Sequence, residues 1–420
     1  MRNLFIFLLL FVFVLSFSSG QNAFGPELNK ALEKDRGGEY RVIVLMKEQF
    51  DVKTLNRGNK AQLISQLQAK RQNSQRWVRR FIQNTQRSHE IKDVHHFWIV
   101  NAITLKTKAD VLRQLALQSD IKGIYLDRDQ VMVRPIKADA TRAAWGVTYI
   151  KADQVQKGGN NGKGVIVAVC DTGIDLDHKG FAPGQILVSK GKSFISGEPT
   201  ADDGHGHGTH CAGTIGSPGY GVAPGVQMVA VKVLSKSGSG SWSGVMQGVE
   251  YAAKVADIMS MSLGGRASTS GNVVETAVKN AIKAGIVCVI AAGNSGTVSP
   301  PNSIGTPGVV KEAITVGAID NRGKLAYFSS RGPTVYGDSK PDICAPGVNV
   351  PSLWKNGGTN TISGTSMATP HVAGLCALIL AKNKNLKPAD IKAILMRTGF
   401  GTKAKNTYGQ GCVDAVASTK

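Results

Sequence analysis

The first part of the chain, up to about residue 133, shows short apolar runs separated by helical patterns. In one long stretch, from Leu63 to Ile82, apolar residues return every three to four positions, as on one face of a helix. A second stretch with this spacing runs from Lys108 to Gln118. The β-rich runs that we expect to form strands are Arg41–Met46, Phe97–Val100, Ala102–Leu105 and Ile121–Leu126. This order of strand, helix, strand, strand, helix, strand predicts a small ferredoxin-like α+β module.

From Gly164 onward, β-rich runs alternate with helical stretches. The predicted strands are Gly164–Cys170, Met228–Leu234, Ile258–Leu263, Ile286–Ala291 and Ala313–Ile319. The predicted helices lie near His207–Ile215, Gly240–Lys254, Asn272–Lys283, Ser366–Leu380 and Pro388–Met396. This alternation predicts an α/β fold, a doubly wound parallel sheet with helices on both faces. In such folds the chemistry lies beyond the carboxyl ends of the strands.

The chain begins with the three parts of a secretory signal. A basic residue is followed by an apolar run from Leu4 to Phe17, and small residues at Ser18 and Gly20 fit cleavage before Gln21. The run is too short to span a bilayer, and no later run reaches the ~18 apolar residues that a membrane helix requires. We therefore expect residues 1–20 to be a signal peptide. The protein is expected to be secreted or held in the lumen of a secretory or lysosome-like compartment, with no membrane span.

Glycine divides the chain more sharply than charge does. Six of the 49 glycines precede residue 141 and 43 follow it, which places a domain boundary near residue 140. The formal net charge of +21 is spread along both parts. The densest basic patch, from Arg71 to Arg87, lies in a glutamine-rich stretch that is typical of a solvated helix face. Solubility explains this charge better than nucleic-acid recognition does, so we expect no nucleic-acid partner.

All six cysteines follow residue 140. An even number of cysteines in an exported chain permits disulfides. However, Cys170, Cys288 and Cys376 lie inside apolar runs, where a free cysteine behaves as a small buried hydrophobe. Free core thiols are therefore favoured over a framework of three bridges, and the absence of CxxC spacing argues against a zinc knuckle.

Four separate segments carry residues suited to nucleophilic catalysis. Asp171 directly follows an apolar strand, and His207 lies in a glycine-rich approach to a helix. Asn294 follows a buried strand, and Ser366 lies at the start of an apolar helix, where the helix dipole and a backbone N–H favour a developing oxyanion. Taken singly, each fits a cap or turn residue. Together they supply a nucleophile, a base, a carboxylate to hold the base, and oxyanion donors.

Two other interpretations of these segments stay open. His205, His207 and His210 fit a metal site, which makes a metallohydrolase the main rival, although no further clustered ligands complete the site. A catalytically silent scaffold is the second, but every catalytic residue type is present. Sensitivity to serine reagents or to chelators distinguishes the serine enzyme from the metal enzyme.

Residues 141 to 420 resemble a subtilisin-family serine endopeptidase. The likeness rests on Asp-Thr-Gly from Asp171, His-Gly-Thr-His from His207 and Gly-Thr-Ser-Met-Ala-Thr-Pro-His from Gly364. The resemblance implies that Asp171 orients the base, that His207 is the general base and acid, that Ser366 is the nucleophile and that Asn294 is an oxyanion donor. The order Asp, His, Ser is the one known for subtilisin. The histidine segment is particularly similar to that of the proteinase K branch.

The resemblance also implies roles for the glycine-rich segments and for the N-terminal part. The strands expected to pair with an extended substrate consist of Gly238, Ser239, Gly240, Ser262, Leu263, Gly264 and Gly265. A dinucleotide loop is the alternative for residues 238–244, but no Gly-x-Gly-x-x-Gly joins a strand to a helix there.

Residues 21–139 resemble the family's inhibitory prodomain. Such a segment acts as a folding template and occupies the cleft until self-cleavage, here expected near residues 134–140. An independent binding module is the alternative for this part. The remaining residues, 140–420, form the expected peptidase domain.

The sequence differs from the subtilisin family at one calcium site and matches it at another. Bacterial subtilisins use the aspartate of a His-Pro-Asp motif as a calcium ligand, but this chain has Lys179-Gly180 after His178, so that strong site is expected to be missing. Asp342, with the carbonyl groups of Lys311 and Ala313, matches a second family site for structural calcium. A purely structural aspartate in a turn is the alternative. No cofactor is expected for catalysis.

These observations predict a secreted serine endopeptidase that is made as a self-processing zymogen. It is expected to hydrolyse peptide bonds of proteins through an acyl-enzyme on Ser366. Its expected partners are protein or peptide substrates and its own prodomain, which acts as chaperone and inhibitor, and we expect a monomer. We expect broad specificity, because an apolar cleft walled by glycine favours apolar side chains without fixing one of them.

Overall fold

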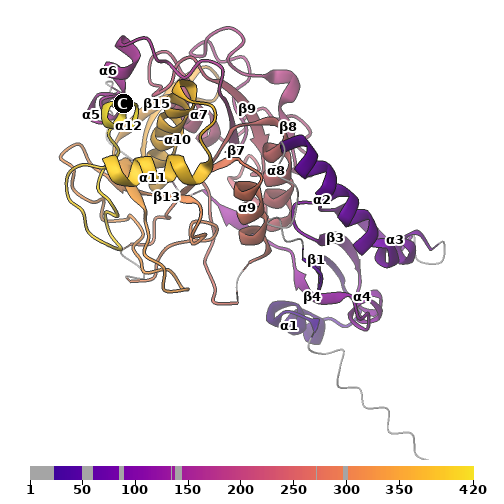
Figure 1. Ribbon diagram of the computed structural model, residues 1–420. Coiled ribbons are helices and arrows are strands. Elements are labelled where there is room, and N and C mark those ends of the chain that lie inside the picture. The colour runs from indigo at the N-terminus through magenta and orange to yellow at the C-terminus, as the bar shows by residue number, and fades with distance from the viewer. Residues whose placement is uncertain are drawn as a thin grey trace, which may run out of the picture. The chain divides into compact units, whose positions relative to one another are not determined.

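The computed structural model describes residues 23–49, 60–84, 89–133, 135–137, 144–270, 272–296 and 301–420. The predicted signal peptide lies outside them, as do Arg134 and residues 138–140 of the predicted cleavage region. The chain forms two compact units (Figure 1). The first comprises Met1–Glu48, Trp77–His95 and Ala102–Leu126, and the second comprises Gln49–Arg76, His96–Asn101 and Asp127–Lys420.

The first unit is built on a four-stranded sheet in the order β2-β3-β1-β4, in which β1 is antiparallel to both neighbours. Its strands are β1 (Glu39–Met46), β2 (Ile91–His96), β3 (Ala102–Lys108) and β4 (Ile121–Leu126). Its helices are α1 (Pro26–Lys34), α3 (Arg76–Gln83) and α4 (Ala109–Ala116). One apolar core joins Leu28 of α1, Val78 of α3 and Leu112 of α4 to the sheet. The predicted ferredoxin-like module is confirmed.

The helical pattern from Leu63 to Ile82 is divided between two helices. It forms α2 (Lys60–Ser74) and α3, with Gln75 between them. Only α3 contributes to the core of the first unit, while α2 belongs to the second unit. The periodicity therefore predicted the helices but not the break that sends them to different units.

The predicted strand at Phe97–Val100 is wrong. These four residues form no strand and are buried as part of the second unit, and strand β2 precedes them in a more polar run. The backbone N–H groups of Trp98 and Ile99 donate to Glu250 Oε1 instead of to a neighbouring strand. Burial of the side chains, not strand formation, explains this apolar run.

The second unit contains a seven-stranded parallel sheet in the order β14-β13-β12-β11-β7-β9-β8. Its strands are β7 (Ile166–Asp171), β8 (Lys192–Ser193), β9 (Gln227–Lys232), β11 (Ile258–Met261), β12 (Val287–Ala291), β13 (Ile314–Ile319) and β14 (Ile343–Pro346). The central strands are buried throughout, which is why they form nearly continuous apolar runs in the sequence. The predicted doubly wound sheet is confirmed.

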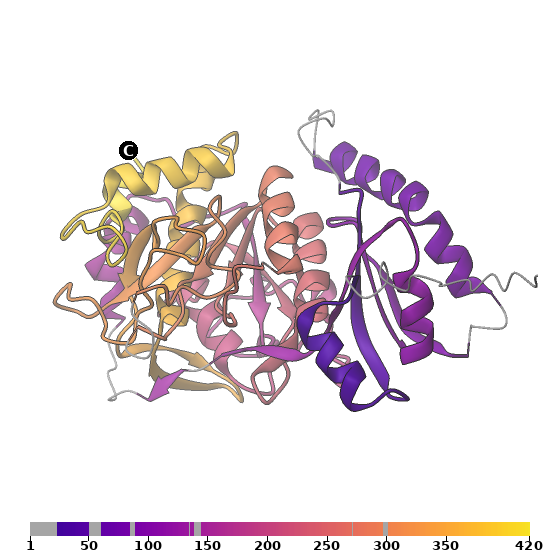
Figure 2. The same ribbon diagram turned by 90° about the horizontal axis from the view of Figure 1, so that it is seen from below.

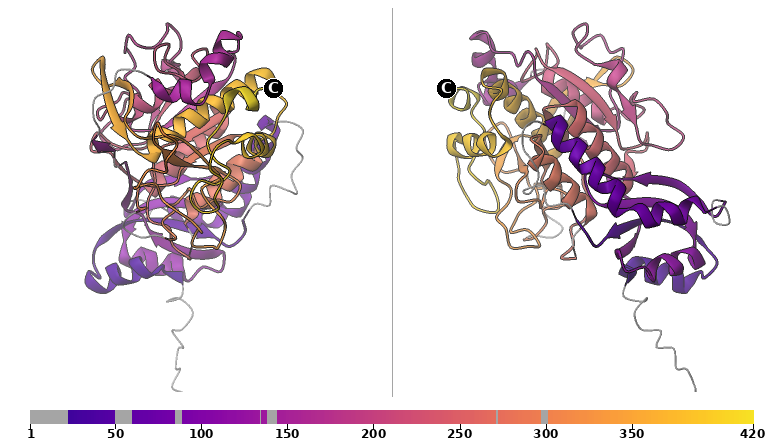
Figure 3. Two further views of the ribbon diagram at one scale, coloured as in Figure 1. Left: turned by 90° about the vertical axis from the view of Figure 1, so that its left-hand side faces the viewer. Right: turned by 45° about the vertical axis from the view of Figure 1, so that its right-hand side comes forward.

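Helices cover both faces of this sheet. On one face, α10 (Thr365–Lys382) packs against β11 to β14 and against α7 (His207–Gly216). On the other, α8 (Trp242–Val255) and α9 (Val273–Lys283) lie side by side (Figure 3). Nearly every residue of α10 is buried, as expected for a helix that is apolar on all sides.

Smaller elements surround the sheet. The hairpin of β15 (Val350–Trp354) and β16 (Gly358–Ser363) adds β6 (Ile136–Lys137), seen in Figure 2 as a purple strand beside the orange hairpin. A two-stranded pair joins β5 (Asp129–Met132) to β10 (Ser239–Ser241). Further helices are α5 (Trp145–Tyr149), α6 (Ala152–Lys157), η3 (Val188–Lys190), α11 (Pro388–Thr398) and α12 (Ala415–Ser418).

All six cysteines are buried free thiols, in agreement with the interpretation of their apolar surroundings. Burial raises the pKa of the Cys288 and Cys376 thiols, so they are poor nucleophiles. No helix in the described part of the chain has both the length and the apolar character needed to cross a bilayer.

Candidate active site

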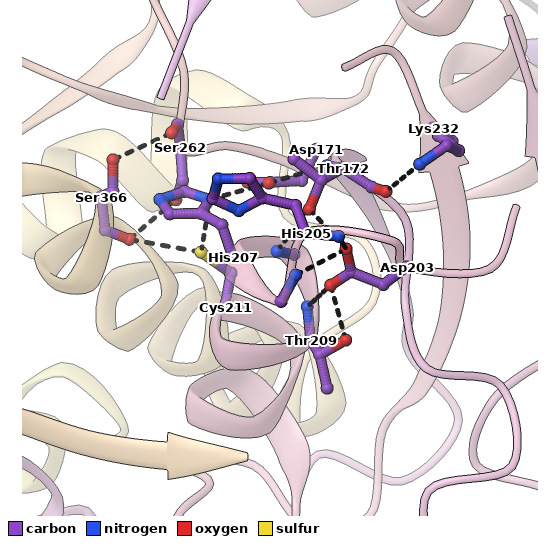
Figure 4. Close-up of polar contacts among 12 residues, drawn as sticks. Asp171, Thr172, Asp203, His205, His207, Thr209, Cys211, Lys232, Ser262 and Ser366 are labelled. Carbon is purple, nitrogen blue, oxygen red and sulfur yellow. Dashed lines mark hydrogen bonds and ion pairs between the residues drawn. The ribbon is translucent and has the colours of Figure 1, made fainter. Parts of the chain in front are cut away.

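The four predicted catalytic residues come from four elements of the second unit. Asp171 is the last residue of β7, and Asn294 follows β12. His207 is the first residue of α7, and Ser366 is the second residue of α10. Three of them, Asp171, His207 and Ser366, meet in one cluster (Figure 4). The carboxyl edge of a parallel sheet is where strand ends and helix starts converge, which explains why residues so distant in sequence meet.

Asp171 fixes the orientation of His207. Nδ1 of His207 lies 2.7 Å from Oδ1 of Asp171, and both side chains are almost completely buried. The Thr172 backbone N–H also donates to Oδ1, at 2.8 Å. Burial disfavours a charged imidazole, but the adjacent carboxylate outweighs this effect and holds the pKa of His207 well above its ordinary value. With Nδ1 as the donor, Nε2 is the basic nitrogen, and it has no hydrogen-bond partner among the described residues.

Ser366 is tied to Ser262 by two hydrogen bonds. Its Oγ donates to the Ser262 carbonyl at 2.9 Å, and the Ser262 hydroxyl donates to the Ser366 carbonyl at 2.8 Å. Because Pro370 has no N–H, it cannot donate the helical bond to the Ser366 carbonyl, which is therefore available to Ser262 and to the Cys211 thiol at 3.5 Å. Figure 4 places the His207 ring between Ser366 and Asp171, although the Ser366 hydroxyl points to Ser262.

Asn294 is held by the start of α10. Its Oδ1 accepts hydrogen bonds from the backbone N–H and the hydroxyl of Thr365, both at 2.9 Å. Its Nδ2 lies on the side of Gly364, where a Cβ would come within 3.2 Å of it. Gly364 has φ of +158°, close to extended backbone. The amide thus presents its oxygen to Thr365, next to Ser366, and its nitrogen to the turn before the helix.

Asp203 and Lys232 also support the cluster, although no motif in the sequence predicted a role for either. Asp203 accepts hydrogen bonds from the backbone N–H groups of His205, Gly206 and Thr209, at 2.9 Å each, and from two threonine hydroxyls. Burial alone raises the pKa of Asp203, but these bonds hold it below its ordinary value. The position of Asp203, just before the start of α7, is the signal in the sequence that could have indicated this role.

Lys232 lies beside Asp171 in the parallel pairing of β9 with β7. Its side chain is almost completely buried, and its Nζ donates to the Thr172 carbonyl at 2.5 Å and pairs with Glu198 at 3.1 Å. This lysine fixes the turn that follows Asp171. In the sequence it appears only as a polar residue in an apolar run.

The three histidines of the metallohydrolase hypothesis do not converge on one point. His207 is engaged with Asp171, and His210 Nε2 lies 3.0 Å from the carbonyl of Val350. Burial lowers the pKa of His210 to about 3, so it is neutral. Among the described residues, the cluster with ligand-like spacing is Asp171, His207 and Cys211 instead. The geometry does not support a site made of His205, His207 and His210.

The two strands that were predicted to bind substrate form backbone hydrogen bonds with a segment of the chain itself. Gly238, Ser239 and Gly240 lie at or next to β10, which pairs with β5. The Val133 N–H donates to the Gly238 carbonyl at 3.0 Å. At Gly240 a Cβ would lie 2.2 Å from a backbone oxygen, so only glycine fits.

The second predicted strand, Ser262 to Gly265, follows β11. The Met132 N–H donates to the Gly264 carbonyl at 3.2 Å, and Gly265 pairs with Thr306 on its other side. Residues 129–133 therefore run between the two predicted substrate strands. Leu263 is buried.

The predicted calcium ligands lie together, away from this cluster. The carbonyl oxygens of Lys311 and Ala313 and the carboxylate of Asp342 converge on the ammonium groups of Lys340 and Lys392. Two lysines thus occupy the place that the resemblance implies for a metal ion.

Comparisons with known proteins cover the part of the chain that holds these residues. The family model described as "Subtilase family" matches residues 162–411. Subtilisin DY of Bacillus licheniformis is 39% identical over 287 residues, which cover 67% of this chain and 100% of that protein. Subtilisin Savinase of Lederbergia lenta is 40% identical over 287 residues, with coverage of 67% and 100%.

Two further comparisons agree. Serine protease AprX of Bacillus subtilis is 38% identical over 365 residues, which cover 75% of this chain and 78% of that protein. The crystal structure of a cold adapted subtilisin-like serine proteinase is 36% identical with a TM-score of 0.57, covering 66% of this chain and 99% of that chain. With a family match over more than half of its length and relatives covered from end to end, this chain belongs to the subtilase family and is a serine endopeptidase of the subtilisin type.

Proposed function

We propose that this chain is the precursor of an exported serine endopeptidase, and that its nucleophile is Ser366. The observation that carries the proposal is the buried pair of Asp171 and His207. The carboxylate holds Nδ1, and in the described part of the chain Nε2 has no hydrogen-bond partner on the side of Ser366. A base fixed in this way accepts a proton from a serine hydroxyl and later returns it to a leaving amine.

Catalysis begins with one rotation of a side chain. The Ser366 hydroxyl turns from the Ser262 carbonyl toward His207 Nε2, which takes its proton as Oγ bonds to the carbonyl carbon of the substrate. His207 then protonates the leaving amine as the C–N bond breaks, and the acyl group stays on Ser366. Water, deprotonated by the same nitrogen, cleaves the ester and restores the hydroxyl.

The negative charge that forms on the substrate oxygen requires hydrogen-bond donors. We assign this role to Asn294 Nδ2 and to the backbone N–H of Ser366, at the start of α10. Thr365 supports the assignment, because its two hydrogen bonds fix the Asn294 amide before any substrate binds. Donors that are already oriented need no reorganisation during the reaction.

The part of the chain before residue 140 is proposed to inhibit the enzyme and to assist its folding. Residues 129–133 lie between the two strands that we assign to substrate binding. Ile136–Lys137 pair with β16, which ends three residues before Ser366. The predicted cleavage region begins between these two paired stretches. A segment bound like a substrate blocks access for other peptides until it is cut.

A second contact supports the same proposal. Glu250 of α8 accepts the backbone N–H groups of Trp98 and Ile99, at 3.0 Å for Ile99. The Asn280 amide of α9 donates to the Ile99 carbonyl at 2.6 Å. Helices α8 and α9 therefore carry polar groups that are satisfied by residues of the proposed prodomain, as expected for a folding template.

The test compares the processing of three full-length chains produced in a secreting host: the wild type, Ser366→Ala, and Ser268→Ala, which removes an exposed serine outside the cluster. We expect the wild type and Ser268→Ala to yield a fragment that begins near residues 134–140, and Ser366→Ala to stay uncut after this point. Mass spectrometry gives the N-terminus in each case, and a terminus at Gln21 in the uncut chain identifies export. Cleavage of Ser366→Ala at the same position and rate would overturn the proposal.

A further inference from the structure

A buried cluster joins the sheet to the surface helix α11 without touching the active site. Its oxygen atoms come from the carbonyls of Lys311 and Ala313, just before β13, and from the carboxylate of Asp342, just before β14. A carboxylate with two backbone carbonyls is a set of hard oxygen ligands, the kind that calcium takes. The family likeness implies a calcium ion here.

Lys340 reaches the cluster from the same strand end. Its Nζ lies 2.5 Å from Asp342 Oδ2, 2.8 Å from the Ala313 carbonyl and 3.5 Å from the Lys311 carbonyl. Only 1% of its side chain is exposed, so water does not compete for these bonds. Its three ammonium protons have three acceptors within the cluster.

Lys392 reaches the same oxygens from α11. Its Nζ lies 2.6 Å from the Lys311 carbonyl, 2.8 Å from the Ala313 carbonyl and 2.9 Å from Asp342 Oδ1. Its three donors are therefore also matched by three acceptors. The two carbonyl groups and the carboxylate therefore each contact both lysines. Asp342 contacts Lys340 through Oδ2 and Lys392 through Oδ1.

This arrangement does not fit a calcium ion. The cluster holds one negative and two positive side chains, so a divalent cation would enter a site that already has an excess of positive charge. The space next to the oxygens is filled by ammonium groups at hydrogen-bond distance. Asp342 Oδ2 also accepts the Thr315 N–H at 2.8 Å, which anchors the carboxylate to β13.

We propose that the ammonium groups of Lys340 and Lys392 replace a structural calcium ion at the Asp342 site. The lysines link β13 to β14 as the ion would, Lys392 also joins α11 to them, and this part of the fold becomes independent of calcium. Removing both lysines leaves the three oxygen ligands in place and creates a site that calcium can fill. The inference concerns stability and does not depend on the proposed catalytic role of Ser366.

The test measures thermal unfolding of the full chain in the Ser366→Ala background, which prevents self-digestion. Each protein is melted once with excess EDTA and once with excess CaCl2. We expect the parent and the control Lys311→Ala to show the same calcium effect. That control removes an exposed nearby lysine but keeps its carbonyl oxygen. In Lys340→Ala/Lys392→Ala, we expect a lower Tm in EDTA and an additional rise of several degrees in calcium.

Adding Asp342→Asn to the double variant assigns this rise to the site, because the rise should disappear with the carboxylate. A double variant that is destabilised but gains no response to calcium would overturn the proposal. If the double variant does not fold, calcium binding to the parent and to Asp342→Asn is compared by isothermal titration. Equal binding supports the proposal, and loss of a bound ion in Asp342→Asn overturns it.

Discussion

Replacing Asp171 with asparagine removes the charge beside His207 and almost nothing else. The Thr172 N–H donates to the same carboxylate oxygen as His207 Nδ1, at 2.8 and 2.7 Å. Because this N–H requires an acceptor, the oxygen of the new amide is expected to stay in that position. The amide nitrogen then replaces Oδ2, which has no hydrogen-bond partner among the described residues. His207 keeps its tautomer and loses the carboxylate charge.

The charge contributes to catalysis by stabilising the imidazolium that forms when Ser366 loses its proton. The two side chains are almost completely buried, and their nearest atoms are 2.7 Å apart. For two unit charges centred about 4 Å apart at an effective dielectric constant of about 20, the attraction is about 4 kcal/mol. Since each 1.36 kcal/mol is a factor of ten in rate, Asp171→Asn should lower kcat about 10³-fold. If the amide turned and forced the other tautomer, the loss would approach about 10⁴-fold.

The assay is peptide hydrolysis by purified, processed enzyme over a range of pH. Asp177→Asn is the matched control, because it removes an exposed aspartate six residues away. Activity requires neutral His207, so it is lost as the pH falls below the pKa of that residue. The Asp171 charge raises this pKa, and its removal should move the acid limb of the profile to lower pH. A loss of less than tenfold, or an acid limb that does not move, would refute the reasoning.

Three further predictions follow from the surroundings of the cluster. Asn294→Leu should lower kcat about 10²- to 10³-fold with little change in KM, a magnitude carried over from subtilisin itself and checked by steady-state kinetics. Asp203→Ala should lower the free energy of unfolding by roughly 3 kcal/mol at neutral pH, measured by denaturant titration in the Ser366→Ala background. Because hydrogen bonds lower the pKa of Asp203, the difference in unfolding free energy between the two proteins should be largest above about pH 4 and should decrease as the pH falls. Glu250→Ala should slow self-processing severalfold in a time course, since it leaves the N–H groups of Trp98 and Ile99 unpaired.

The sequence predicted the sheet and the catalytic cluster well because both depend on local signals. Strands such as β7 and β12 are short, apolar and buried on both faces, so they are visible as runs. The polar residues that end these runs lie at one edge of the sheet. Asp171, His207 and Ser366 therefore meet where the parallel topology requires. The similarity of the histidine segment to the proteinase K branch stays a prediction.

The features that the sequence did not predict depend on contacts between distant residues. The run at Phe97–Val100 is as apolar as a strand, but its N–H groups find Glu250 more than 150 positions later. Lys392 reaches the Ala313 carbonyl from 79 positions away, so nothing near Asp342 indicated that a second ammonium group occupies the expected calcium site. The hydrogen bond from Ser366 Oγ to the Ser262 carbonyl also joins residues that are far apart in the sequence. Local periodicity carries no information on such pairings.

The central claim is that Ser366 is the nucleophile, and covalent labelling tests it most directly. A fluorophosphonate forms a stable adduct only with a serine that is activated by a base and an oxyanion site. We predict that mass spectrometry of the labelled, processed enzyme finds the adduct on the peptide that contains Ser366, and that a His207→Ala chain cut in trans by the wild-type enzyme carries none. A folded, processed enzyme that carries no adduct on Ser366, or that carries it on another residue, would contradict the account.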